Sequence, residues 1–271
     1  MIVDLHCHSN CSDGSLSPSE LIELAEKSNV ELLSITDHDN VDAYESINGT
    51  EASMKIISGI EFSTVWNKVG IHIIGLNIDT QSKPLQASIN LQKQARKDRA
   101  LTVSKRLEKF GLVDGYNKII VSTNPSKIGR PDFAKLLIQE GIAKDWNQAF
   151  KKYLGAGKAG DVKSHWLPFE QVVTTIIESG GVAVLAHPLY YKLTNSKLKR
   201  LLVDLVKQGG EGLEVLNGHQ NADKTHYLCQ LCQNFGLKVS VGSDFHHPDG
   251  RTKLGINVNK FKNMNAVWDF F

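Results

Sequence analysis

Apolar runs of strand character alternate with helical periods at the start of the chain. A strand is predicted at residues 2–5, an amphipathic helix at 20–28 and a second strand at 32–35. Ser17 followed by Pro18 is typical of a helix N-cap and a first helical position, so the helix is expected to begin there. This β-α-β order predicts an α/β fold with roughly parallel strands.

The same alternation returns after Pro168 and continues to about residue 242. Helices are predicted at 169–179, 196–208 and 223–235, and strands begin at Val182, Leu213 and Val239. Glycines are expected at the helix ends because they readily adopt the left-handed backbone of a C-cap; they are Gly180, Gly181, Gly209, Gly210 and Gly236.

The middle of the chain has a different pattern. Residues 90–110 and 132–139 have a helical period, and Ile119-Ile120-Val121 is the one strand-like run between about 92 and 165. We therefore expect a small, mostly helical insertion at residues 92–165, serving as a cap, between two parts of an α/β domain at residues 1–91 and 166–271.

Seven apolar runs contain or end near a histidine or a carboxylate. A barrel of parallel strands brings the C-terminal ends of its strands to one mouth, where residues distant in sequence converge. The pattern thus predicts one polynuclear metal site, with candidates His6, His8, Asp13, His38, Glu61, His72, His187, Asp244 and His246.

His6-Cys7-His8 is the strongest local signal in this set. Successive side chains of a strand point to opposite faces, so both imidazoles are expected on one side and Cys7 on the other. Imidazole with carboxylate suits manganese, iron or zinc and disfavours a thiolate site. Cys229 and Cys232 fall on one face of a predicted helix, where core packing is the simpler interpretation.

Composition limits the class of protein. A chain of 271 residues with 41% hydrophobic residues can bury a full core. No signal sequence and no apolar run of membrane-spanning length is found, so a soluble cytoplasmic protein without a membrane partner is expected. Four cysteines in a chain this long do not predict a disulfide framework.

The net charge of +2 hides an asymmetry. Residues 92–165 hold 16 Lys and Arg against 7 Asp and Glu, or +9, and the rest of the chain holds 15 against 22, or −7. An acidic domain suits cations and a basic segment suits an anionic substrate, although a solvated helical surface would also account for the lysines.

Six short motifs resemble the polymerase and histidinol phosphatase (PHP) family of metal-dependent phosphoesterases. They are the opening Asp-Leu-His-Cys-His-Ser, Ser12-Asp13-Gly14, Thr36-Asp37-His38-Asp39, Gly59-Ile60-Glu61, Ala186-His187-Pro188 and Gly242-Ser243-Asp244-Phe245-His246. The resemblance implies a distorted (βα)7 barrel with a site for three divalent metal ions, with manganese expected and iron or zinc as alternatives.

The resemblance also implies how the ligands are shared. His6, His8, Glu61 and Asp244 would surround one metal. Glu61 would bridge to a second metal held by His72 and His187, and Asp13, His38 and His246 would hold a third. The catalytic residues would be Glu61, Asp244 and His187, with a metal-bridging hydroxide attacking a phosphate ester.

Within that family the insertion resembles enzymes that hydrolyse nucleoside 3′,5′-bisphosphates or shorten RNA from its 5′ end. The expected substrate is a phosphorylated nucleotide or a short oligonucleotide, and no protein partner can be inferred. Arg130 and Lys158 are candidate phosphate ligands, and His219 is a candidate substrate contact.

Three other functions remain open. A histidinol phosphatase would share the metal ligands, and a noncatalytic PHP module would bind nucleic acid through the basic segment. An amidohydrolase would need a metal-bridging lysine at a strand end, where this chain has Glu61.

Overall fold

The computed structural model of the chain describes residues 1–250 and 252–271. By their contacts these residues divide into two compact units, one of residues 1–89 with 168–271 and one of residues 90–167. The first unit is a mixed α/β structure, and the second is helical. Within the described residues, no helix is long and apolar enough to span a membrane.

One sheet of the first unit is built around the N-terminal strand. Its order is β3-β2-β1-β9, with β1–β2 and β2–β3 parallel and β9 antiparallel to β1. The strands are β1 (Ile2–Cys7), β2 (Leu32–Ile35), β3 (Lys55–Ile56) and β9 (Ile256–Asn257). The helices beside it are α1 (Pro18–Lys27) and α2 (Asp42–Ser46).

The predicted amphipathic helix α1 covers this sheet. Its apolar face, which includes Leu21 and Ala25, packs in one core cluster with Cys7, Leu33 and Ile35. Ser17 is the N-cap and forms a reciprocal capping box with Glu20, which confirms the expected helix start.

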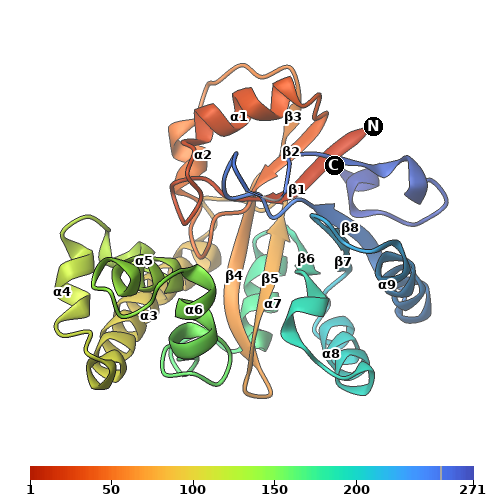
Figure 1. Cartoon of the computed structure of the whole chain (residues 1–271). Coiled ribbons are helices and arrows are strands. Elements are labelled where there is room, and N and C mark those ends of the chain that lie inside the picture. Colours follow the sequence, from red (N-terminus) through yellow and green to blue (C-terminus); the bar gives the residue numbers. More distant parts are fainter. Residues whose placement is uncertain (251) are drawn as a thin grey trace. The chain divides into compact units, whose positions relative to one another are not determined.

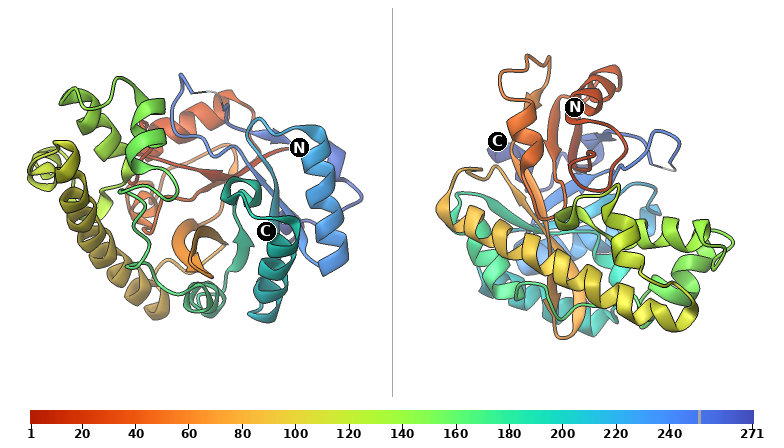
Figure 2. Two further views of the ribbon diagram at one scale, coloured as in Figure 1. Left: turned by 60° about the horizontal axis from the view of Figure 1, so that its bottom comes forward. Right: turned by 90° about the vertical axis from the view of Figure 1, so that its left-hand side faces the viewer.

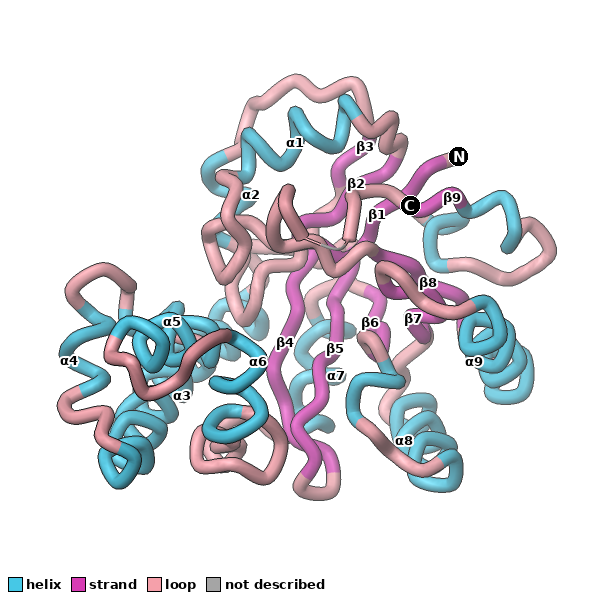
Figure 3. Tube along the Cα trace, in the orientation of Figure 1, coloured by secondary structure: helices cyan, strands magenta, loops and turns pink. Residues whose placement is uncertain are grey.

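The second sheet has the order β4-β5-β6-β7-β8. Its strands are β4 (Gly59–Trp66), β5 (Val69–Leu76), β6 (Val182–Leu185), β7 (Gly212–Asn217) and β8 (Lys238–Gly242). The expectation of parallel strands holds for β6, β7 and β8 but is wrong for β5, which runs antiparallel to both β4 and β6. The long hairpin of β4 and β5 is visible in Figure 3, and its two-residue turn leaves no room for a crossover helix.

Three helices pack against the second sheet or one another, namely α7 (Phe169–Glu178), α8 (Asn195–Lys207) and α9 (Ala222–Phe235). They follow one another along the outside of the strands (Figures 1 and 2). All three lie within two residues of the predicted bounds. The glycines that follow them have positive φ, as expected: Gly180, Gly209 and Gly236.

Short contacts at the ends of the strands connect the two sheets. Isolated parallel bridges join Cys7 to Phe245 and His38 to Glu61. The buried carboxylate of Asp4 in β1 accepts hydrogen bonds from the backbone N–H groups of Ser243 (2.9 Å) and Gly255 (2.8 Å). These bonds fix the segment after β8 against β1.

The second unit has its own hydrophobic core, with Val103, Leu107, Phe133 and Leu137 fully buried. Its helices are α3 (Lys83–Leu107), which starts in the first unit, α4 (Gly115–Ile120), α5 (Arg130–Gln139), α6 (Trp146–Ala149) and a π-helix at Phe150–Leu154.

The strand-like run Ile119-Ile120-Val121 is the end of α4 and the residue after it, so that interpretation is wrong. Three apolar residues are too few to distinguish a helix from a strand. The backbone N–H of Leu167 donates to Oε1 of Gln92 (3.2 Å), so the beginning and the end of this unit lie side by side.

The remaining short helices are of 3₁₀ type. They are Glu108–Phe110, Pro125–Lys127, Pro188–Tyr191, Val258–Phe261 and Val267–Phe270.

The close approach of β8 to β1 requires glycine at position 242. A Cβ atom there would lie 2.3 Å from Cβ of His6 and 2.7 Å from its backbone nitrogen.

We predict that Gly242→Ala lowers the free energy of unfolding by about 3 kcal/mol or more, because neither strand can move away without displacing His6. Gly49→Ala is the control: its φ of +79° is strained for alanine but nothing lies within 4 Å, so it should cost about 1 kcal/mol. Equal losses in chemical denaturation would contradict this account.

Candidate metal centre

His6 and His8 lie on one side of the first strand, as predicted. Their ring centroids are 5.2 Å apart, whereas Cys7 points into the apolar core on the opposite side. Both histidines are fully buried. Alternation along the strand therefore delivers two imidazoles to one place.

Glu61 in β4 lies among five imidazoles. Its Oε1 is 2.8 Å from Nδ1 of His72 and 2.9 Å from Nε2 of His187. Its Oε2 lies near three further nitrogens, Nδ1 of His38 (3.0 Å), Nε2 of His8 (3.3 Å) and Nε2 of His6 (3.4 Å). These ligands come from β1, β4 and β5 and from the ends of β2 and β6, so the Glu61 carboxylate is where the two sheets meet.

A second carboxylate lies at one end of the group. Oδ1 of Asp13, in the turn after β1, is 3.3 Å from Nε2 of His246, and its Oδ2 is 3.7 Å from Nε2 of His38. His246 stacks on His8 with ring centroids 4.3 Å apart. Asp13, His8, His38 and His246 thus form one compact set of ligand atoms.

Asp244 completes the cluster after β8. Its Oδ1 lies 3.3 Å from Nε2 of His8 and 3.5 Å from Nε2 of His6. The structure groups His187 with His6 and Asp244, and His72 with His38 and Glu61. All nine predicted ligands therefore come together, and the sharing among three metals that the resemblance implied stays a prediction.

The carboxylates in the cluster are held in their charged form. Burial alone would raise the pKa of Glu61, but His72, His38 and His6 hold it well below its usual value. The same balance of burial against neighbouring histidines lowers the pKa values of Asp244 and Asp13. A buried site with three anionic carboxylates requires positive charge beside them.

The residues present fit divalent cations. Nε2 of His6, Nε2 of His8 and Oε2 of Glu61 are buried and form no hydrogen bond with any described residue, although the two nitrogens lie 3.4 Å and 3.3 Å from that oxygen. Burial, followed by the charges of His246 and His38, lowers the pKa of His8 to about 4, so its ring is neutral at pH 7 and can bind a metal. Nitrogen and oxygen atoms in this arrangement match a site for metals such as manganese, iron or zinc.

Glu214 is a residue of this site that the sequence interpretation missed. Its Oε1 lies 2.9 Å from Nδ1 of His6, and its Oε2 accepts hydrogen bonds from the backbone N–H of His187 (2.5 Å) and from Nδ2 of Asn217 (3.3 Å). An ionised carboxylate only accepts, so His6 then carries its proton on Nδ1 and directs the Nε2 lone pair into the cluster. The feature that could have identified Glu214 is that it is the single acidic residue inside the fully buried strand β7.

Asp37 and Asp39 flank His38. Asp37 accepts hydrogen bonds from the hydroxyls of Ser9 (2.5 Å) and Ser12 (2.6 Å), and Asp39 accepts one from the backbone N–H of Ser63 (2.7 Å). Asp37 therefore stabilises the turn that carries Asp13.

The three candidate substrate contacts belong to different units of the chain. His219 follows β7 in an exposed turn and belongs to none of the ligand groups. Arg130 and Lys158 lie in the 90–167 unit, where Arg130 is the half-buried first residue of α5 and Lys158 is exposed on a turn.

Asp161 lies near the segments of both cations within their unit. It accepts a hydrogen bond from the backbone N–H of Gly157 (2.8 Å), next to Lys158. Partial burial would raise the pKa of Asp161. Hydrogen bonds from Lys163 and Gly157 and the charge of Arg130 outweigh that effect and lower the pKa. Arg130 and the Lys158 turn therefore lie in one region of that unit.

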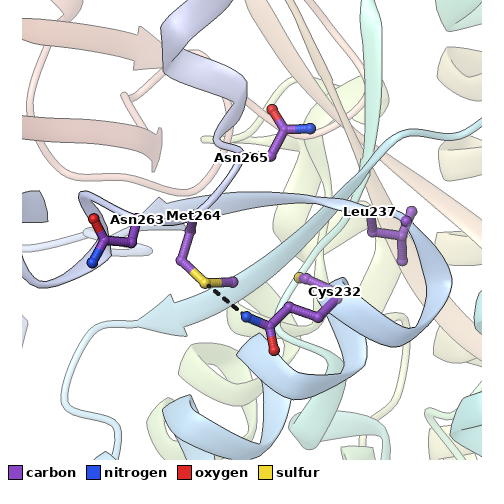
Figure 4. Close-up of a pocket in the computed structure, with 7 residues that line it drawn as sticks. Cys232, Leu237, Asn263, Met264 and Asn265 are labelled. Atoms are coloured by element: carbon purple, nitrogen blue, oxygen red, sulfur yellow. Dashed lines mark hydrogen bonds between the residues drawn. The ribbon is translucent and has the colours of Figure 1, made fainter.

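A separate small pocket of about 160 Å³ lies at the C-terminal end of α9 (Figure 4). It is lined by Cys232, Gln233, Gly236, Leu237, Asn263, Met264 and Asn265. None of the predicted site residues lines it, and Cys232 is a buried free thiol, in keeping with core packing.

Comparisons with known proteins agree with this site. A model of the PHP domain family matches residues 4–163. The chain is 38% identical over 270 residues to a 5′-3′ exoribonuclease of Haemophilus influenzae, covering 99% of this chain and 98% of that protein. It is 36% identical to a 3′,5′-nucleoside bisphosphate phosphatase of Chromobacterium violaceum, covering 98% and 95%.

A solved structure is similar over nearly the whole chain. It is an amidohydrolase from Chromobacterium violaceum with bound sulfate and no metal; the TM-score is 0.90, the sequence identity is 32%, and the match covers 99% of this chain and 95% of that one. With the family match, the full-length relatives and the clustered ligands together, the chain belongs to the PHP domain family.

Proposed function

We propose that this enzyme, a metal-dependent phosphoesterase, hydrolyses the 3′-phosphate of nucleoside 3′,5′-bisphosphates and also acts on short 5′-phosphorylated RNA or DNA. The observation that carries the proposal is the buried cluster of nine histidine, aspartate and glutamate side chains around Glu61. Two relatives that match almost the whole chain, one named for a bisphosphate phosphatase activity and one for an exoribonuclease activity, support this choice of substrate.

The finer features of the proposal follow from the same family. We expect the two sheets to form the distorted (βα)7 barrel of PHP proteins, the segment 92–165 to be its insertion, and three ions, with manganese preferred, to be bound. A cytoplasmic location is part of this proposal.

The cluster has a buried side and an exposed side. His6, His8 and Glu61 are almost completely buried, whereas the side chains of His72 and His246 are 25% and 28% exposed. A phosphate ester would therefore approach from the side of His72 and His246. Bound divalent cations would neutralise phosphate oxygens and lower the pKa of a water molecule in that place.

The protein's own residues supply position and charge. Glu61 keeps five imidazoles directed at one volume, and Asp244 adds a second negative charge beside His6 and His8. Glu214 holds His6 through its side chain and His187 through its backbone, so one buried carboxylate orients ligands from two strands. Such preorganisation keeps the ligands from turning away when substrate binds.

Arg130 and Lys158 are proposed to bind the phosphate that is not cleaved. Both belong to the basic 90–167 unit, and Asp161 brings their segments together. A guanidinium can donate hydrogen bonds to two phosphate oxygens at once, which suits Arg130 to a terminal phosphate.

We predict that Glu61→Ala loses bound metal and activity together, because no neighbouring group can replace a carboxylate that lies among five imidazoles. Turnover should fall by at least about 100-fold, since even indirect partners of metal ligands are worth 10- to 100-fold. His226→Ala, which removes an exposed histidine of α9, is the control and should retain metal and rate. Elemental analysis that finds full metal content in Glu61→Ala, with normal turnover, would refute the role.

We predict that Glu214→Gln weakens metal affinity roughly 10- to 100-fold without loss of folding. The carboxylate now accepts from His6 on one oxygen and from His187 and Asn217 on the other, whereas the amide has one accepting oxygen and its NH₂ would face a donor. Glu211→Gln, at the exposed start of the same strand, is the matched control. Metal titration by calorimetry, with thermal unfolding measured in parallel, checks this; unchanged affinity in Glu214→Gln would remove Glu214 from the centre.

We predict that a nucleoside 3′,5′-bisphosphate is hydrolysed with a much higher kcat/KM than a nucleoside 3′-monophosphate, because the 5′-phosphate supplies remote binding energy. Arg130→Ala should reduce this preference by roughly ten- to a hundredfold, and added salt should raise KM for the bisphosphate. The exposed Arg106 of α3, changed to alanine, is the control. A wild-type enzyme that treats both substrates equally would reduce the function to that of an unspecified phosphoesterase.

A further inference from the structure

Two adjacent tyrosines follow His187 in the 3₁₀ helix Pro188–Tyr191, and their environments differ. Tyr191 joins β5 to the end of β6: its hydroxyl donates to the carbonyl of Ala186 (2.8 Å) and accepts from the backbone N–H of His72 (2.9 Å). Tyr190, by contrast, is 61% exposed. The ring of Tyr190 is therefore left at the surface beside the metal centre.

The exposed ring of Tyr190 is held in a defined orientation. It stacks on the ring of His187 with centroids 5.2 Å apart and an angle of 16° between the planes. The backbone N–H of Tyr190 donates to the carbonyl of His187 (3.0 Å), which fixes the turn between them. A flat apolar surface thus extends outward from a ligand of the cluster.

Other exposed aromatic rings do not share this position. In the described part of the chain, the large aromatic side chains that are most exposed are Phe110, Trp146, Tyr190 and Phe270. Of these, Tyr190 is the one that stacks on a cluster residue. A tyrosine side chain is uncharged at neutral pH, so this ring offers a stacking face rather than a charge.

We propose that the outer face of Tyr190 is a binding subsite for the nucleobase of the substrate. The inference rests on the proposed nucleotide function and adds the part of the substrate that the metal ligands and the arginine would not contact. The reacting phosphate would lie at the cluster. The base would stack on the face of Tyr190 that points away from His187, with about 4.5–7 Å between the centroids of the base and the tyrosine ring.

Stacking explains which nucleotides this subsite would accept. Every base presents a π-face, so recognition by an aromatic platform tolerates any sequence, and the larger purines gain more contact than the pyrimidines. Hydrogen bonds to base edges would instead impose selectivity.

The test compares two ligands that differ only in the base. Adenosine 5′-monophosphate, the product of the proposed reaction, and ribose 5-phosphate are titrated by calorimetry into the full-length, manganese-loaded protein. Wild type should bind the nucleotide about tenfold more tightly, since stacking of one base on an aromatic ring is of that order. Tyr190→Ala should lose this advantage while its affinity for ribose 5-phosphate stays unchanged, and Tyr190→Phe should keep it.

Phe270→Ala, which removes an exposed ring that lies over Lys238, is the matched control and should behave as wild type. The inference is overturned if Tyr190→Ala keeps the tenfold advantage, if wild type has none, or if both ligands weaken equally, because the last result would mean that Tyr190 acts through His187. Hydrolysis of p-nitrophenyl phosphate but not of any nucleoside bisphosphate would instead refute the proposed function, so the two failures are distinguishable.

Discussion

The buried carboxylate of Glu61 can remain charged only with positive charge around it, and much of the structure serves this requirement. Five imidazoles from β1, β5 and the ends of β2 and β6 lie within 3.4 Å of its two oxygens. Without them burial would favour the protonated acid, which is a poor metal ligand. The charged state of this one side chain therefore depends on the order of strands in the two sheets, which brings the five imidazoles to it.

A second layer of buried polar groups keeps those imidazoles in place. Glu214 holds His6 and the backbone of His187, Tyr191 holds the backbone of His72, and Asp4 fixes the segment that carries Asp244. Each of these groups accepts a hydrogen bond from at least one backbone N–H group, which limits its freedom to turn. Rigidity at the centre thus comes from main-chain hydrogen bonds supplied by neighbouring strands.

Much of this arrangement could be predicted from the sequence, because its signals are local. The cap at Ser17, the glycines after α7, α8 and α9, and the nine polar residues in or after apolar runs are all visible as short patterns, and the nine do lie together. Their metal-binding roles stay predictions. The direction of β5 could not be predicted, because apolar alternation is the same in either direction. Glu214 was missed because its importance depends on a partner 208 residues away.

The side-by-side ends of the 90–167 unit have an evolutionary consequence. Since the backbone of Leu167 bonds to the side chain of Gln92, the chain leaves the α/β unit and returns to it at nearly one point. A segment attached in this way, with a core of its own, can be lengthened, shortened or exchanged while the strands on either side keep their register. Recombination at this junction would let descendants acquire new specificities around an unaltered set of ligands.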